Sequence, residues 1–563
     1  MTVLSSFPPG LILVLGALLL PFLPGIFRQI GIVGLPAIAL WAVWQVPDGV
    51  QLTVPFLDYV LEPVEGTRVG RVFATVFAIM ALTGGVFGMR QSRTLEVVAG
   101  YAYAGSAMGV AFAGDLITMF VFWELMAVGS TLVIWAAGTE GAYRAARRYL
   151  QIHLFGGVVL MIGVVGFVLE SGSVDFVAMR PESFATWMIL IGFLINAGAP
   201  PFSAWLPDAY PEASPSGAVF LSAFTTKTAV FVLWIGFPGT ELLIYVGLYM
   251  ACYGIIYALL ENDMRRILAY SIINQVGFMV CAIGIGTELA LNGAAAHAFT
   301  HIIYKALLLM SAGSVMYMTG KRKCTDLGGL YKTMPLTCIC GTIGALAISS
   351  FPLTSGFVSK SMINLAAADE HLTLAWFVLT AASAGVFLHA GIKFPWFVFF
   401  QKDSGLRPKE PPFNMKLGMI FFAFLCIALG VMPGPLYAIL PFPVDYVPYT
   451  TAHVAEMLQL LLFSGLAFFV LLPAMKRTLT ISLDFDWFYR VAGPYISHAI
   501  VHSLSLLGGS LERFMTARIK QGITWIEKHH GLDGMMAKTL PAGTMALVVI
   551  AVLVVYLVIY LLR

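Results

Sequence analysis

Charged residues are scarce in this chain of 563 residues. Aspartate, glutamate, lysine and arginine together make up 11% of it, whereas a soluble domain carries about 25%. Hydrophobic residues make up 59%, and the mean hydropathy is +0.88. This composition predicts a protein embedded in a lipid bilayer. The formal net charge of +3 gives no indication of a nucleic-acid partner.

Cysteine is also rare, and the patterns that hold cofactors are missing. The six cysteines include no Cys-x-x-Cys pair and lie at no metal-ligand spacing from a histidine. No dinucleotide-binding glycine pattern, phosphate loop or iron–sulfur spacing occurs. We therefore expect no metal, no cofactor and no catalytic residue for redox or hydrolytic chemistry in this chain. Any enzymatic activity would belong to a larger assembly in which the chain serves as a transporter or translocase module.

Long apolar segments dominate the sequence, and a membrane span needs about 20 helical residues. Sixteen segments are long enough to cross or nearly cross a bilayer, which predicts an all-α polytopic membrane protein. They lie near residues 10–28, 31–46, 70–89, 95–113, 115–137, 149–170, 184–201, 216–236, 240–260, 267–287, 292–318, 334–358, 373–400, 415–438, 455–474 and 541–562.

The basic residues between these segments predict an orientation. Loops after odd-numbered spans hold eighteen lysines and arginines, including Lys476 and Arg477, whereas loops after even-numbered spans hold three, Arg68, Arg71 and Arg180. Positive loops stay in the cytoplasm, so the N-terminus is expected outside. The first span lacks a basic n-region and a small-residue cleavage site, so we expect it to be retained.

Several ionisable side chains interrupt the apolar segments, where each charge costs several kcal/mol. His297, His301 and Lys305 recur at i, i+4 and i+8 and share one helix face, which is typical of a relay for protons or cations. A lysine in a bundle can instead form a structural salt bridge, and His297 can be a core histidine bonded to a backbone carbonyl. We expect Lys393 to snorkel toward the interface. The six that we single out as candidates are Glu124, Lys227, His297, His301, Lys305 and Lys360.

Two spans carry helix-breaking residues at membrane depth. Pro200 and Pro201 interrupt span 7, and Pro352 and Gly356 interrupt span 12. Broken spans in matching positions of two halves indicate a transport site in an inverted repeat. The sequence predicts spans 1–3 in residues 1–94, a first five-helix repeat of spans 4–8 in residues 95–236, and a second of spans 9–13 in residues 240–400.

The C-terminal part departs from this plan. Spans 14 and 15 occupy residues 415–474, and residues 485–540 form an amphipathic segment that is too polar to span. We expect a lateral helix on the cytoplasmic side, about 47 Å long over residues 496–527, with a bend at Gly508–Gly509. Residues 541–563 would be its anchor span. Its expected task is to brace a neighbouring subunit, and the alternative is binding to the lipid surface.

The motifs together resemble a known family. They are GFLINAGAPPFSAWLPDAYPEASPSGAVFLSAFTTKTAVF, FVFWEL around Glu124, RRILAYSIINQVGF, the row from His297 to Lys305, and TSGFVSK. This set is similar to the antiporter-like membrane subunits shared by Mrp-type sodium/proton antiporters and respiratory complex I, and most similar to the Mrp D subunit. The resemblance implies two inverted five-helix repeats and a chain of buried polar residues along the membrane midplane.

By this resemblance, Glu124 corresponds to the glutamate that the family has in span 5. Lys227 corresponds to the family's span 8 lysine, Lys305 to its central lysine and Lys360 to its span 12 lysine. Asn196 stands where the family has a span 7 lysine that pairs with the glutamate. Without that cation, three alternatives remain for the first half. It is a retuned proton path, a cation site that uses the Asn196 carbonyl oxygen, or a half-channel that has lost conduction.

These observations favour an ion-translocating subunit of a multi-subunit cation/proton antiporter, with sodium as the expected cation, in the bacterial inner membrane. Its proton path would use Glu124, Asn196, Lys227, the two histidines of the row, Lys305 and Lys360. The expected partners are other membrane subunits, protons, Na⁺ and the lipid bilayer. One alternative is a proton-pumping subunit of a complex I-like or membrane hydrogenase-like enzyme, and another is a non-conducting structural subunit.

Overall fold

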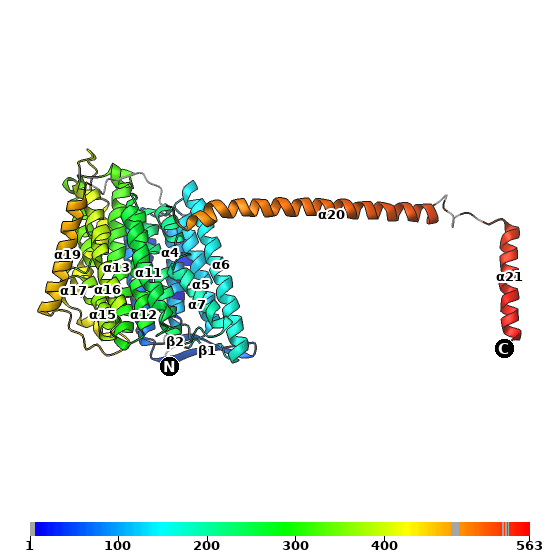
Figure 1. Cartoon of the computed structure of the whole chain (residues 1–563), viewed down its shortest axis with the longest axis horizontal. Coiled ribbons are helices and arrows are strands. Elements are labelled where there is room, and N and C mark those ends of the chain that lie inside the picture. Colours follow the sequence, from blue (N-terminus) through cyan, green and yellow to red (C-terminus); the bar gives the residue numbers. More distant parts are fainter. Residues whose placement is uncertain (1–5, 474–482, 532–533, 535–537, 539, 563) are drawn as a thin grey trace. The chain divides into compact units, whose positions relative to one another are not determined.

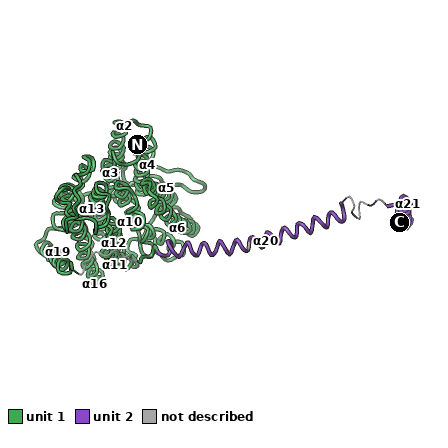
Figure 2. Tube along the Cα trace, turned by 90° about the horizontal axis from the view of Figure 1, so that it is seen from above, with its two compact units in different colours: residues 1–486 green, residues 487–563 purple. Residues whose placement is uncertain are grey.

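The computed structural model describes residues 6–473, 483–531, 534, 538 and 540–562. The chain divides into two compact units, residues 1–486 and residues 487–563 (Figures 1 and 2). The basic pair Lys476–Arg477, which contributed to the predicted orientation, lies outside the described residues, as do the first five residues of the chain.

The first unit begins with four helical segments and a hairpin. The helical segments are α1 (Pro9–Leu19), the 3₁₀ turn η1 (Leu20–Phe22), α2 (Gly25–Val43) and α3 (Arg68–Gly88). Strands β1 (Gly49–Phe56) and β2 (Tyr59–Gly66) pair antiparallel, with Phe56 opposite Tyr59, and lie at one end of the helical bundle (Figure 1). The all-α expectation missed this hairpin. Its signal is the β-branched and aromatic content of VQLTVPF.

The helices of the first half, residues 95–236, are interrupted in two places. They are α4 (Thr94–Phe112), α5 (Leu116–Trp135), α6 (Glu140–Ser171), α7 (Phe184–Ala197), α8 (Trp205–Ala209), η2 (Tyr210–Glu212), α9 (Pro215–Leu221) and α10 (Thr225–Gly236). The predicted break at Pro200–Pro201 is confirmed, because α7 ends at Ala197 and the chain turns at Gly198 with φ +78°. The break between α9 and α10 was not predicted.

The second half, residues 240–400, is likewise irregular. Its elements are α11 (Leu242–Leu260), α12 (Met264–Ile285), α13 (Glu288–Thr319), η3 (Cys324–Asp326), η4 (Leu330–Lys332), α14 (Pro335–Ile348), α15 (Ser355–Asp369), α16 (Thr373–Val386), and the π-helical η5 (Phe387–Lys393) and η6 (Trp396–Phe400). The gap between α14 and α15 confirms the predicted break at Pro352. The inverted relation of the two halves stays a prediction.

Three further helices complete the first unit, α17 (Phe413–Val431), α18 (Gly434–Ala438) and α19 (Thr451–Leu471). In the described chain, thirteen spans are long and apolar enough to cross a membrane, and three shorter apolar helices accompany them. The chain is therefore a mainly helical, multi-pass membrane protein. The number of sixteen crossings stays a prediction.

Helices α12 and α13 form the centre of the first unit. The apolar window of α12 is entirely buried, and α13 packs against α3, α9, α12, α14, α15 and α17. A helix that is enclosed on all sides presents even its polar side chains to protein rather than to lipid. The row from His297 to Lys305 lies on this helix.

The second unit consists of the π-helical η7 (Phe488–Ala492), α20 (Gly493–His530) and α21 (Ala542–Leu561). Helix α20 has 38 residues and is about 57 Å long. It continues as one helix through Gly508 and Gly509, and the bend expected there stays a prediction. Of the predicted segment 485–540, residues 532–533, 535–537 and 539 lie outside the described residues.

Candidate functional site

The break between α9 and α10 determines the surroundings of Lys227. A helix that ends inside the protein leaves carbonyl oxygens without their intrahelical partners. The Lys227 ammonium donates to one of them, the Ser222 carbonyl oxygen at 2.7 Å, and to Thr226 Oγ1 at 3.0 Å. The side chain is fully buried. The interruption thus supplies polar groups that solvate a buried ammonium group.

Lys360 has a similar place in the second half. It lies on α15, just after the interruption that follows α14. Its Nζ is 3.5 Å from the carbonyl oxygen of Ile348, the last residue of α14, and 5.3 Å from the ring centre of Phe278. Each half therefore brings one buried lysine to a carbonyl group that a broken helix leaves free.

Lys305 and His297 form hydrogen bonds to side chains of α12 and α15. Lys305 Nζ donates to Ser271 Oγ at 2.8 Å. His297 Nδ1 lies 3.2 Å from Ser359 Oγ and its Nε2 lies 3.0 Å from Gln275 Oε1. His297 is thus held by side chains, and the alternative of a core histidine bonded to a backbone carbonyl does not apply.

His301 lies between these groups. Its ring is 6.2 Å from the His297 ring and 5.2 Å from the Tyr304 ring. Lys227 and Lys305 are both its electrostatic neighbours. Neither ring nitrogen has a hydrogen-bond partner among the described residues. The histidine is therefore free to accept or donate a proton on either nitrogen without breaking a hydrogen bond within the protein.

The three buried lysines Lys227, Lys305 and Lys360 have no counter-ion among the described residues. In the described part of the chain, no carboxylate lies within ion-pair distance of Lys227, Lys305 or Lys360; the ion pairs there join other residues. A structural salt bridge therefore does not account for these lysines. Within the described ranges, no three His, Cys, Asp or Glu side chains are grouped to hold a metal ion.

Glu124 and Asn196 lie in the first half near a residue that we did not predict. The carboxyl oxygen Oε1 of Glu124 has no hydrogen-bond partner within the described chain and lies against Gly157 of α6, where a Cβ atom would overlap it. Asn196 Oδ1 is 2.8 Å from Nδ1 of His153, also on α6. Sequence reasoning missed His153 because it lies only four residues into the predicted span 149–170.

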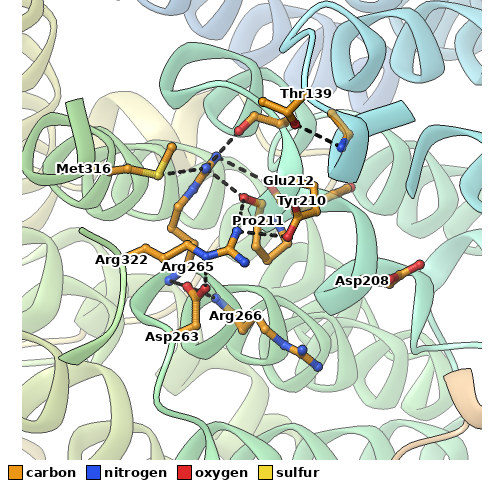
Figure 3. Close-up of polar contacts among 12 residues, drawn as sticks. Thr139, Asp208, Tyr210, Pro211, Glu212, Asp263, Arg265, Arg266, Met316 and Arg322 are labelled. Carbon is orange, nitrogen blue, oxygen red and sulfur yellow. Dashed lines mark hydrogen bonds and ion pairs between the residues drawn. The ribbon is translucent and has the colours of Figure 1, made fainter. Parts of the chain in front are cut away.

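Arg265, at the start of α12, is a second residue whose contacts we did not predict. Arg265 is one of the eighteen basic residues counted in the predicted cytoplasmic loops, and its side chain is buried. Its guanidinium donates to four carbonyl groups between α8 and α9, and neighbouring ion pairs join Arg322 to Glu212 and Asp263 (Figure 3). The four carbonyl groups belong to Tyr210, Pro211, Ala213 and Ser214. This contact connects the broken first half to α12.

Lys393 also differs from its prediction. It is buried and does not snorkel. Its ammonium donates to the carbonyl oxygens of Ala258, Leu259 and Glu261 at 3.0, 2.6 and 2.6 Å. Because these carbonyls lie at the C-terminal end of α11, Lys393 is a helix cap contributed by another element.

Comparison with known proteins identifies the fold. Residues 113–388 match the family model described as NADH:quinone oxidoreductase/Mrp antiporter, TM. The chain is 28% identical over 429 residues to the D subunit of the Na(+)/H(+) antiporter of Alkalihalophilus pseudofirmus, a match that covers 70% of this chain and 83% of the relative. It is 31% identical over 359 residues to the A/B subunit of a probable K(+)/H(+) antiporter of Rhizobium meliloti, covering 59% of this chain and 36% of that protein.

A solved structure extends the similarity to nearly the whole chain. The membrane-bound sulfane sulfur reductase, an archaeal respiratory membrane complex, contains a chain with a TM-score of 0.70 and 21% sequence identity. The match covers 98% of this chain and 99% of that chain. By the family-model match, residues 113–388 belong to the antiporter-like membrane subunit family that Mrp antiporters share with NADH:quinone oxidoreductase, and the solved structure shows the same fold over nearly the whole chain.

Proposed function

We propose that this chain is an ion-translocating subunit of a multi-subunit cation/proton antiporter, with sodium as its cation. The observation that carries the proposal is a set of buried lysines that have no counter-ion within the described part of the chain, Lys227, Lys305 and Lys360. A buried ammonium that lacks a carboxylate is costly, so its proton is easily passed on. Protons move between these lysines by way of His301 and His297, and Glu124 and Asn196 belong to the first half of the path.

The proposed place of the protein is the bacterial inner membrane, with its N-terminus outside and residues 485–540 on the cytoplasmic side. The distribution of basic residues supports this orientation. Other membrane subunits complete the ion path, because the family comprises subunits of larger assemblies.

Everted membrane vesicles test the function. The complex is assembled with its other subunits, and the proton gradient is followed by fluorescence while Na⁺, K⁺ or a buffer cation is added. Cation-dependent loss of the gradient, with Na⁺ most effective, supports antiport. A gradient that no cation discharges, with the complex fully assembled, contradicts it.

A second candidate is a proton-pumping subunit of a redox-driven respiratory enzyme. It is favoured by the match to the respiratory complex chain, which covers 98% of this chain and so includes the C-terminal helices. A fold alone does not decide between the two functions. Purification of the native complex distinguishes the two functions, because co-purifying redox subunits and substrate-driven proton uptake indicate the pump. A non-conducting structural subunit predicts neither activity.

Helix α20 is proposed to brace a neighbouring subunit. Its long apolar residues, such as Ile500, Leu504 and Leu511, are exposed within the chain. Deletion of residues 487–563 is expected to leave the first unit inserted while the complex loses subunits during purification. If the truncated complex keeps its composition and its thermal stability, bracing is wrong and binding of α20 to the lipid surface remains.

A further inference from the structure

The surroundings of His153 are those of a functional residue rather than of a structural residue in the core. It is 1% exposed, and its Nδ1 is hydrogen-bonded to Asn196 Oδ1 at 2.8 Å. Its Nε2 has no partner among the described residues. Trp205 packs against the ring at 4.7 Å between centroids and is itself fixed by a 3.1 Å hydrogen bond from its indole to the Ile195 carbonyl. The ring is therefore held in one orientation with one free nitrogen.

The Glu124 carboxyl group lies against Gly157 of α6, which is one helical turn along from His153. Its Oε1 occupies the space that a side chain at Gly157 would fill, and residues 153 and 157 lie about 6 Å apart on the same face of α6. A glycine at 157 thus lets the carboxyl group approach the backbone of α6. Glu124 has no ionic partner within 4 Å in the described chain, and its separation from His153 is therefore also more than 4 Å.

Hydroxyl groups connect His153 toward Lys227. The Tyr149 ring is 4.1 Å from the His153 ring. The Tyr149 hydroxyl lies 3.3 Å from Thr225 Oγ1 and donates to Ser130 Oγ at 3.0 Å. Thr225 precedes Thr226, whose hydroxyl accepts from Lys227 Nζ. Groups that can relay a proton therefore lie between His153 and the lysine of α10, while no hydrogen bond among the described residues joins the imidazole to the Tyr149 hydroxyl.

We propose that His153, oriented by Asn196, is the proton-exchanging group opposite Glu124 and passes protons between Glu124 and the Thr225–Lys227 region. This inference rests on the proposed ion-translocating function and adds a residue to it. It favours the retuned proton path over a cation site, because the hydrogen bond to His153 occupies the amide oxygen that a cation would need.

The titratable and charged groups around His153 come from each neighbouring element. Among the elements packed against α6, α5 carries Glu124 and η2 carries Tyr210, and Tyr149 lies on α6 itself with its ring 4.1 Å from the His153 ring. The bidentate pair of Arg148 and Asp208, at 2.7 Å for both bonds, is internally neutralised. Glu124 is therefore the carboxyl group among them that is available to exchange a proton with the imidazole.

The main test replaces His153 by glutamine, which keeps a polar partner for Asn196 but does not titrate. Antiport in everted vesicles, normalised to assembled complex, is expected to fall about tenfold or more. His453→Gln is the matched control, because that imidazole lies on α19 and is bonded to the Pro448 carbonyl. Asn196→Lys in the His153→Gln background is expected to restore flux, since the lysine returns a titratable cation.

A second variant covers the case in which His153→Gln does not assemble. Asn196→Asp places a carboxylate against the imidazole, which favours its charged form, so the pH profile of antiport is expected to move to higher pH. An unmoved profile overturns the proposal. So does wild-type flux in His153→Gln while Lys305→Ala is inactive. If Lys305→Ala also transports normally, the proposed function itself has failed.

Discussion

Arg265 is predicted to be the main structural connection between the two halves at this end of the bundle. Its two terminal nitrogens donate to carbonyl oxygens of Pro211, Ala213 and Ser214 at 2.9, 2.8 and 2.9 Å, and to that of Tyr210 at 3.3 Å. Arg265→Ala removes these bonds and leaves four carbonyl groups to find other partners. Breaking a buried charged network in this way costs about 3–5 kcal/mol.

Arg265→Lys separates charge from geometry. A lysine keeps the positive charge but cannot present the planar fork that satisfies four carbonyl groups. We expect it to lose about 2 kcal/mol, which is the value of one or two charged hydrogen bonds. A purely electrostatic role would leave this variant as stable as the wild type.

The measurement is thermal unfolding of the purified complex in detergent. Arg265→Ala is expected to lower the apparent melting temperature by roughly 5 °C. Arg144→Ala is the control, because its pair with Glu140 at 3.7 Å is exposed and contributes no more than about 0.5 kcal/mol. If Arg265→Ala and Arg144→Ala melt within a degree of each other, the connection does not stabilise the fold.

Three further predictions follow from other contacts. Asp484→Asn weakens the acceptor for the Tyr253 and Tyr270 hydroxyls, so hydrogen exchange at residues 483–486 should accelerate, with Tyr249→Phe as an unaffected control. Unchanged exchange contradicts this. Lys393→Met leaves the carbonyls at the end of α11 uncapped and should reduce stability by about 2–3 kcal/mol, while flux per assembled complex stays normal. Reduced flux at normal stability would instead place Lys393 in the path. Burial, followed by the charges of Glu62 and Asp175, raises the pKa of Glu65. Its charged form therefore destabilises the fold above the raised pKa, and below the ordinary carboxyl pKa this penalty is absent. Glu65→Gln should raise the melting temperature at pH 8 but not at pH 4, and equal gains at both pH values count against the argument.

The apolar segments and the helix breakers were readable from the sequence, because each acts locally. Pro200–Pro201 and Pro352 interrupt helices wherever they lie, and His297, His301 and Lys305 share a face of any helix that contains them. The break at Ser222–Phe224 was not predicted, since it contains no proline and no glycine.

The side-chain partners could not be predicted, because they depend on packing between distant segments. Arg265 is near the end of a polar loop in the sequence, yet it is buried against residues 51 to 55 positions earlier. His153 and Asn196 are 43 positions apart, and nothing local indicates that they meet. The hairpin of β1 and β2 lies between the predicted spans 31–46 and 70–89, in a segment for which the sequence analysis predicted no element.

The most direct test of the central claim is proton flux in Lys305→Ala. Lys305 lies on the enclosed helix α13, and its ammonium donates to Ser271 Oγ at 2.8 Å, with no carboxylate of the described residues within ion-pair distance. A relay predicts that alanine abolishes cation-dependent flux per assembled complex, and that arginine, which does not release its proton near neutral pH, fails nearly as badly. Wild-type flux in Lys305→Ala, at a normal level of assembly, would contradict the proton path proposed for this protein.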